Sequence, residues 1–439
     1  MLVQHNTFFR ISDHLSEIVN NEFVGCIAGK EYQCHRTKTG AIVNCIGNDF
    51  FEQLKSSMQE SPYSLMLDAS NDTGIEKMFP ITVRIFYINF NRIMTKFFDM
   101  NLLTGRRAST AEEMLNSVDE QLTNNDISWE YCTALGVDNT NTNIGEYNSL
   151  KSRAIAKNAS LVVVGCPCHI LHNASQKSGA EFAKVVGFDL EDHSVDLSYW
   201  FHKSSKRKSI LKEYNEFCNE EYADVVEFAS TRWLSLEKCI SREIDKFDGI
   251  KSYFLSENHS EERFKRLKQS YEDSMTIIYL RFYHSTLPVF NNFNKLLQSE
   301  DPLIYRLHEA QHTFMTKLIS KFVDHHVIQN HLSQNKPFTS LDVSRCNQVD
   351  DEELSVGLLT QELIDHLLNE YDVTPRELQC FYKGVRAFFS KAFQYCCMWL
   401  RLDDDLLKYC VFADVRKRAD TPFSYVEKTL PYFHIFIRP

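Results

Sequence analysis

Two acidic residues stand where short apolar runs end, and these are the positions best suited to chemistry. Residues 64–67 lead to Asp68, and residues 134–137 lead to Asp138. Runs this short are typical of strands buried on both faces, although periodicity alone does not exclude a buried helix. Strand ends and the loops after them line the clefts of open α/β sheets. Both acids are therefore candidates for an active site.

A pair of carboxylates at neighbouring strand ends can hold a divalent metal through hard oxygen ligands. Such a metal activates the attacking oxygen and stabilises the leaving oxygen in phosphoryl transfer. The alternative is structural: Asp138 precedes the small polar residues 139–142 and could cap the turn that they form. The residues alone leave both interpretations open.

The elements that would position these acids follow from apolar periodicity and turn residues. After helices at 13–24 and 48–60, strands are expected at 63–68, 80–88 and 93–103, then a helix over 108–122. The strand 134–137, a helix at 147–157 and a further apolar run at 161–164 complete this part.

A dense group of soft ligands follows around Pro167, namely Cys166, Cys168, His169 and His172. Zinc is one interpretation of this group. Structural zinc normally takes four ligands, and no second cluster stands at zinc-finger spacing. We therefore favour a packing and hydrogen-bonding corner that fixes the strand end, and we do not expect zinc.

Two basic segments could contact nucleic acid. The first segment contains Lys206, Arg207 and Lys208. Its functional interpretation is a phosphate-contacting face or a weak nuclear-import signal. Its structural interpretation is the solvated start of a helix. Arg232 and Trp233 could hold a phosphate and stack on an unpaired base. The alternative for Trp233 is a core position at a helix start, and the residues alone favour that alternative.

From about residue 179 the pattern becomes helical. Long periodic segments cover 234–254, 261–297, 302–332, 351–370 and 374–400. Pro288 is expected to kink or end its helix. Thr374 and Glu377 form a capping box around Pro375. The aromatic stripe through Phe381, Phe388, Phe389, Phe393 and Trp399 predicts core.

Bulk properties limit the class of protein. The chain has 439 residues, 43% hydrophobic and 24% charged, which are globular values. Its 13 cysteines lack the dense regular spacing of a secreted disulfide scaffold. No signal peptide or long apolar span is evident. We expect an intracellular protein, not secreted and with no membrane partner. The net charge of −11 argues against broad nonspecific nucleic-acid binding.

Four motifs resemble the hAT superfamily of cut-and-paste DNA transposases, in the domesticated, BED-finger-associated animal form. They are SLMLDASNDTG at 64–74, LGVDNTNTNIG at 135–145, CPCH at 166–169 and STRWLS at 230–235. The resemblance implies an α/β RNase H-like core, a mixed sheet flanked by helices, interrupted by a large all-α insertion. It further implies that Asp68 and Asp138 are catalytic ligands of Mg²⁺ or Mn²⁺. Arg232 and Trp233 would contact transposon-end DNA. The protein would lie in the nucleus, with the cytoplasm as a second possibility.

The corresponding domain plan has an entry segment at 1–44, the first part of the core at 45–178, the helical insertion at 179–400 and a return segment at 401–439. The sequence departs from the family pattern at both ends. A BED finger, a third catalytic acid beyond residue 431 and the dimerisation segment are not found. We therefore expect little or no DNA strand transfer. The alternatives are a non-catalytic interaction or regulatory scaffold and an incomplete gene product.

Overall fold

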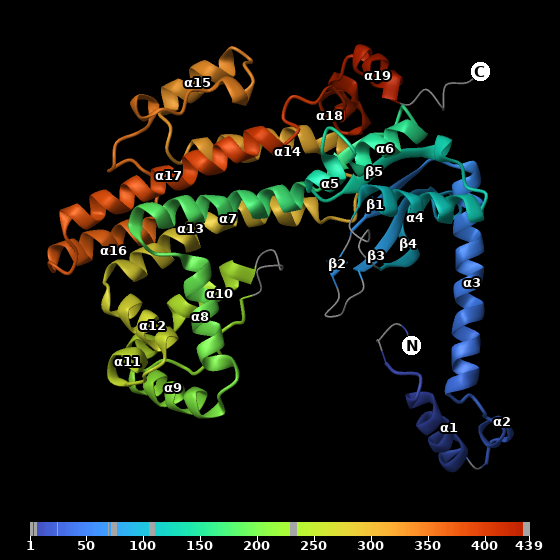
Figure 1. Ribbon diagram of the computed structural model, residues 1–439, viewed down its shortest axis with the longest axis horizontal. Helices are drawn as coiled ribbons and strands as arrows, with labels where there is room; N and C mark the ends of the chain where they lie inside the picture. Colours follow the sequence, from blue (N-terminus) through green and yellow to red (C-terminus); the bar gives the residue numbers. More distant parts are fainter. Residues whose placement is uncertain are drawn as a thin grey trace. The chain divides into compact units, whose positions relative to one another are not determined.

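The computed structural model describes residues 3, 7–23, 25–68, 70–71, 77–104, 110–228 and 235–432. They form two compact units: the first unit ends at Gly165, and the second unit spans Cys166–Tyr432 (Figure 1). The division falls between Gly165 and Cys166, whereas the sequence suggested a core segment reaching to residue 178. The difference arises because a helix begins directly after the strand that ends at Gly165.

The first unit is built on an open, mixed β-sheet. Across the sheet the strands follow the order β4, β3, β1, β5, β6, and the short β2 pairs with β3 beyond the end of β1. β3 is antiparallel to both β4 and β1, while β1, β5 and β6 run parallel to one another. The strand bounds are β1 Tyr63–Leu67, β2 Ser70–Asn71, β3 Lys77–Tyr87, β4 Arg92–Leu103, β5 Cys132–Val137 and β6 Val162–Gly165.

Every strand expected from the sequence in the first unit is present, with shifts of a few residues at the ends. Alternation explains why they pair: Leu65, Val83 and Leu135 are fully buried and lie level with one another on β1, β3 and β5. The strand that leads to Asp138 therefore lies beside the strand that leads to Asp68.

Helices precede the sheet, flank it and connect β4, β5 and β6. Their bounds are α1 Ile11–Glu22, α2 Ile27–Lys30, α3 Arg36–Glu60, α4 Ala111–Asn124, α5 Asn141–Ile144 and α6 Leu150–Lys157, with 3₁₀ turns at Ile88–Phe90 and Trp129–Tyr131. Leu54 and Met58 of α3 and Val118 of α4 are buried in the same core as the strands. α3 begins at Arg36, so the expected boundary at residue 44 falls inside a helix.

The described part of the second unit is helical apart from an isolated bridge between Val323 and Gln348. Its helices are α7 Pro167–Val186, α8 Leu190–His202, α9 Ser205–Phe217, α10 Ser235–Asp245, α11 Phe247–Ser256, α12 Glu262–Glu272, α13 Met275–Leu297, α14 Ile304–Ile319, α15 His325–Ser333, α16 Leu358–Asn369, α17 Pro375–Trp399, α18 Asp405–Tyr409 and α19 Phe423–Thr429. The 3₁₀ turns are Phe338–Ser340, Arg345–Asn347, Cys410–Ala413, Arg418–Asp420 and Leu430–Tyr432.

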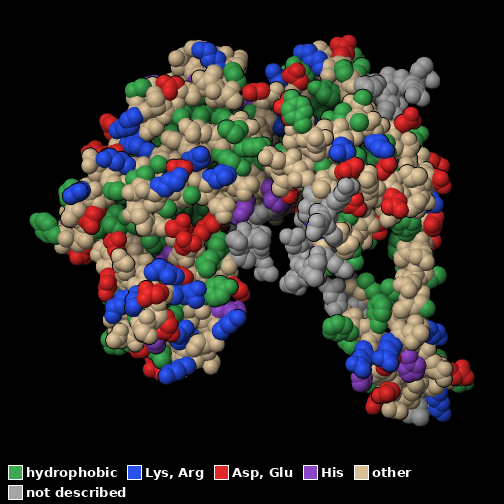
Figure 2. Space-filling view, viewed as in Figure 1, with side chains coloured by type: hydrophobic (Ala, Val, Ile, Leu, Met, Phe, Trp, Pro, Cys, Tyr) green, Lys and Arg blue, Asp and Glu red, His purple; other side chains and the backbone are tan. Residues whose placement is uncertain are grey.

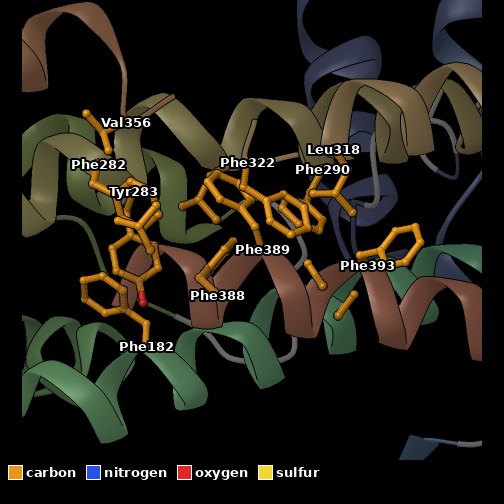
Figure 3. Packing of buried hydrophobic residues seen from close by; sticks show 14 of the residues in the cluster. Phe182, Phe282, Tyr283, Phe290, Leu318, Phe322, Val356, Phe388, Phe389 and Phe393 are labelled. Atoms are coloured by element: carbon orange, nitrogen blue, oxygen red, sulfur yellow. The ribbon is translucent and has the colours of Figure 1, made fainter. Parts of the chain in front are cut away.

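Aromatic side chains form the centre of the second unit. Phe182 of α7 lies 5.4 Å from Phe282 and 5.4 Å from Tyr283 of α13, measured between ring centroids (Figure 3). Phe388 and Phe389 of α17 are fully buried in the same cluster. Rings at these distances contact edge to face or stack. The predicted core stripe is confirmed for its four phenylalanines, whereas Trp399 is only partly buried against the cluster.

Several long helical segments are divided more finely than expected. The segment 261–297 is two helices, because the Asp273 carboxylate accepts the N–H of Met275 at 2.8 Å and starts α13. In 302–332, Asp324 similarly accepts the N–H of His326 at 2.8 Å and starts α15. α13 continues past Pro288 to Leu297, so Pro288 does not end this helix.

Charges of both signs are mixed on the visible surface. Lys and Arg side chains alternate with Asp and Glu over α9 and α11 at the lower left of Figure 2. Within the described ranges, no helix combines the length and apolarity needed to cross a membrane.

Candidate metal-binding site

Strand register brings the two candidate acids to the same edge of the sheet. Met66 of β1 lies opposite Gly136 of β5 in parallel pairing. Asp68 and Asp138 each stand two residues beyond that pair. Since neighbouring strands lie about 4.8 Å apart, this register sets the two residues just beyond the ends of adjacent strands, at the carboxyl edge of the sheet.

Loop geometry holds one oxygen of Asp138. Its Oδ1 accepts the backbone N–H of Thr140 at 3.0 Å and the side-chain Nδ2–H of Asn143 at 2.6 Å. The first bond is the turn-capping bond that the structural alternative anticipated. Both bonds reach Oδ1, and within the described residues Oδ2 accepts none. Turn formation and ligand binding are therefore compatible at Asp138.

Asp68 is exposed, and no hydrogen bond or ion pair reaches it within the described residues. Two carboxylates on adjacent strands are the hard oxygen donors that Mg²⁺ and Mn²⁺ prefer. Asn143 adds a further feature: its Oδ1 is buried without a hydrogen-bond partner in the described ranges. The donor chemistry thus fits a hard divalent ion. No group of three or more His, Cys, Asp or Glu side chains in the described chain is arranged to hold a metal.

Asn143 is the residue of this site that sequence reasoning missed. It lies in the short helix α5, five positions after Asp138, and only 7% of its surface is exposed. Its signal in the sequence is weak, because the loop 139–143 alternates Asn and Thr and any of these could face the acid. Only the fold shows which amide contacts the carboxylate.

The corner at Cys166 is the start of a helix. Cys166 is the residue before α7, and Pro167 occupies the first helical position. Hydrogen bonds from the Cys168 thiol and the His169 side chain hold the pKa of the Cys166 thiol well below its usual range. The hydrogen bond to Cys166, with burial, raises the pKa of Cys168. This arrangement suits the hydrogen-bonding corner that we favoured over zinc.

Of the three residues of α9 predicted to contact phosphate, Arg207 and Lys208 have partners within the fold. The Arg207 guanidinium lies 3.4 Å from the centre of the Trp200 ring, and its Nη2 is 2.7 Å from Glu261 Oε1. Lys208 Nζ is 3.2 Å from Asp224 Oδ1. Lys206 is exposed. A phosphate contact by this segment remains a prediction, with Lys206 as its most accessible member.

Arg232 and Trp233 lie outside the described residues, so their proposed DNA contacts also remain a prediction. Comparisons of the chain with family models, curated proteins and solved structures find no match.

Proposed function

We propose that this protein derives from a hAT-type transposase and binds DNA in the nucleus through an RNase H-like core that holds Mg²⁺ or Mn²⁺. Asp68 and Asp138 are the metal ligands in this proposal. The observation that carries it is the parallel register of β1 and β5, which sets both acids at one sheet edge.

The strand connections give further support. Three antiparallel strands follow one another along the chain as β1, β3 and β4. The helix α4 then leads to β5, which returns parallel to β1 on its other side. A hairpin-linked trio followed by a strand beside the first is the arrangement that an RNase H-like sheet requires. The all-helical second unit is compatible with a large insertion.

A divalent ion at this edge would polarise a phosphate and favour the ionised form of the attacking hydroxyl or water. The chain's own contribution is positional: β1 and β5 fix the two carboxylates, and Asn143 and the Thr140 N–H orient Asp138. Since only two carboxylates are assigned to the metal, we expect DNA cleavage about 10³-fold or more below that of a complete site, from the few kcal/mol that one electrostatic stabiliser contributes.

The test is metal-dependent DNA binding and nicking by the full chain. A labelled hairpin with a flanking duplex would be bound more tightly with Mn²⁺ than with EDTA, and Asp68→Asn and Asp138→Asn should each remove that difference. Nicking should stay slow. Metal-independent binding that both variants retain would contradict the assigned site, while rapid Asp68-dependent nicking would contradict the weak activity.

A scaffold function is the second candidate, and the hydrogen bonds of Asp138 favour it. Both bonds are structural and would be made in a protein that binds no metal. In that case Asp138→Ala should lower stability by about 1 kcal/mol through the lost turn bonds. Asp68→Ala should then leave the stability unchanged, because the Asp68 side chain is exposed and makes no hydrogen bond or ion pair within the described residues.

A further inference from the structure

The second unit contains a groove that its own side chains leave open. It has a volume of about 810 Å³ and lies between the last turns of α13, one face of α14 and the segment that holds Arg416 and Lys417. On α14 the lining includes Arg306, Ala310, Thr313 and Lys317, spaced three or four residues apart. This spacing defines one helix face, and Arg306, Thr313 and Lys317 on it are exposed.

The floor of the groove is apolar and rigid. Phe293 of α13 and Phe314 of α14 stack with their ring centres 4.9 Å apart. Val289 and Leu296 extend the apolar surface along α13 and remain half-buried. A half-buried aliphatic floor can gain stabilisation from an incoming apolar side chain at about 25 cal/mol per Å² covered.

The rim of the groove is positively charged. Its lining contains four cations and one carboxylate, Glu309, which pairs with Lys417 at 2.5 Å. Arg416 is held by Asp414 at 2.7 Å. Arg306 and Lys317 have no carboxylate partner within the described residues. The whole chain has a net charge of −11, so the charge of the rim is opposite in sign to the charge of the molecule.

We propose that this groove binds an acidic amphipathic helix from a protein partner. The apolar floor would take residues spaced at i, i+3 or i+4 and i+7, as in other helix-in-groove complexes. Asp and Glu on the flanks of that helix would pair with Arg306 and Lys317. The α14 face from residue 306 to 317 is about 16 Å long, which matches about three helical turns.

The lining favours a peptide over single-stranded nucleic acid. Nucleic-acid grooves combine cations with aromatic faces on which bases stack. Here the aromatic residues that line the groove, Phe293 and Phe314, stack on each other and are only 6% and 3% exposed. They offer no open ring face to a base. The proposal is independent of the metal site, because every residue that it uses lies in the second unit.

The experiment measures fluorescence anisotropy of a labelled synthetic helix with Leu at i, i+3, i+4 and i+7 and Glu or Asp elsewhere. The probe is titrated with the full chain, alongside a scrambled peptide of the same composition and a single-stranded oligonucleotide. We expect the amphipathic probe to bind about tenfold or more tightly than the scrambled peptide, and binding should weaken with added salt.

Substitutions of groove residues test whether the peptide binds in the groove. Arg306→Glu with Lys317→Glu should weaken binding about tenfold or more, since two attractions become repulsions. Thr313→Trp should also weaken it, by filling the groove from an exposed position. The control Arg376→Glu with Lys383→Glu makes the same charge change at exposed sites on α17 and should alter affinity less than about twofold.

Circular dichroism would show that each variant remains folded. Equal binding of the scrambled peptide, or equal loss in the groove and control variants, would overturn the proposal. Groove-dependent binding of the oligonucleotide in place of the peptide would overturn it as well and assign the groove to nucleic acid.

Discussion

The carboxylate of Asp138 has two oxygens, and the fold uses one of them. Oδ1 accepts hydrogen bonds from the Thr140 backbone N–H and from the Asn143 side chain. These two bonds fix the plane of the carboxylate and direct Oδ2 away from both donors. A hydrogen-bonded ligand of this kind binds metal with less loss of rotational freedom. Local structure thus supports both the turn and the metal interpretations at the same residue.

Asn143 gives a prediction about positioning. Asn143→Ala should weaken Mn²⁺ binding about 10- to 100-fold, the usual effect of losing a residue that orients a ligand. It should also lower stability by about 1 kcal/mol. Isothermal titration with Mn²⁺ measures the first effect, and Asn141→Ala, at an exposed position of the same short helix, is the matched control. Equal affinity in both variants would refute the positioning role.

Cys166 gives a prediction about pH. Its lowered pKa keeps it a thiolate below neutral pH, so iodoacetamide should still alkylate it at about pH 6, where an ordinary thiol is mostly protonated. Cys168→Ala removes the principal donor, raises the pKa of Cys166 and should slow alkylation at about pH 6 by about tenfold or more. Peptide mass spectrometry resolves the site, and Cys45→Ala, an exposed thiol elsewhere, should leave the rate at Cys166 unchanged.

Residue types and strand ends indicated Asp68 and Asp138 as a pair, and the register agrees with that pairing. The partners of the pair were not predictable, because hydrogen bonds such as Asn143 to Asp138 depend on loop conformation. For the basic segment on α9 the composition left phosphate contact, an import signal and a solvated helix start open. It could not show that Arg207 packs on Trp200 and pairs with Glu261, because both contacts depend on the fold.

At the scale of elements, α7 and α17 pack closely around one glycine. A Cβ at Gly384 would lie 2.8 Å from Val186 Cγ1 and 3.1 Å from Phe182 Cδ2. Both neighbours are short or rigid side chains in a buried contact, so they have little room to move. The absence of a side chain at residue 384 therefore sets the spacing of these two helices.

Gly384→Ala should destabilise the second unit by about 1–3 kcal/mol through overpacking. The loss should occur although Ala favours helix over Gly by about 1 kcal/mol. Gly47→Ala in α3, where a Cβ meets nothing within 4 Å, should instead be stabilising. Urea unfolding measures both changes, and a stabilised Gly384→Ala protein would show that the two helices can separate without cost.

Element type was easier to predict than element boundaries. Short apolar runs and β-forming residues identified the strands of the sheet, and in β1 and β3 every second side chain is buried. The breaks between α12 and α13 and between α14 and α15 were missed, since single hydrogen bonds to the carboxylates of Asp273 and Asp324 interrupt a continuing apolar pattern. Pro288 was expected to kink or end α13, but the helix continues past it.

At the scale of the whole molecule, each unit has a core of its own. Leu135 belongs to the core of the first unit, and Phe389 belongs to the aromatic core of the second. The sequence suggested a division near residue 178, but it could not show that the helix after Gly165 belongs to the helical unit. The first unit holds one hydrophobic cluster and the second holds two, and none of the three spans both units.

Core truncations should therefore act locally. Leu135→Ala should cost about 2–5 kcal/mol and Phe389→Ala about 3–5 kcal/mol. Hydrogen exchange followed by mass spectrometry should show lost protection chiefly in β1 and β5 for the first variant and in α7, α13 and α17 for the second. Equal loss throughout the chain in both variants would show that the two cores unfold as one.

The most direct test of the proposed metal site is Mn²⁺ binding by the full chain, followed by electron paramagnetic resonance of the free ion. Binding should be measurable in the unmodified protein, and Asp68→Asn and Asp138→Asn should each weaken it strongly, whereas Asp126→Asn, on a turn of the first unit, should not. If all four proteins bind Mn²⁺ equally, or none does, then the two acids at the edge of the sheet are not a metal site.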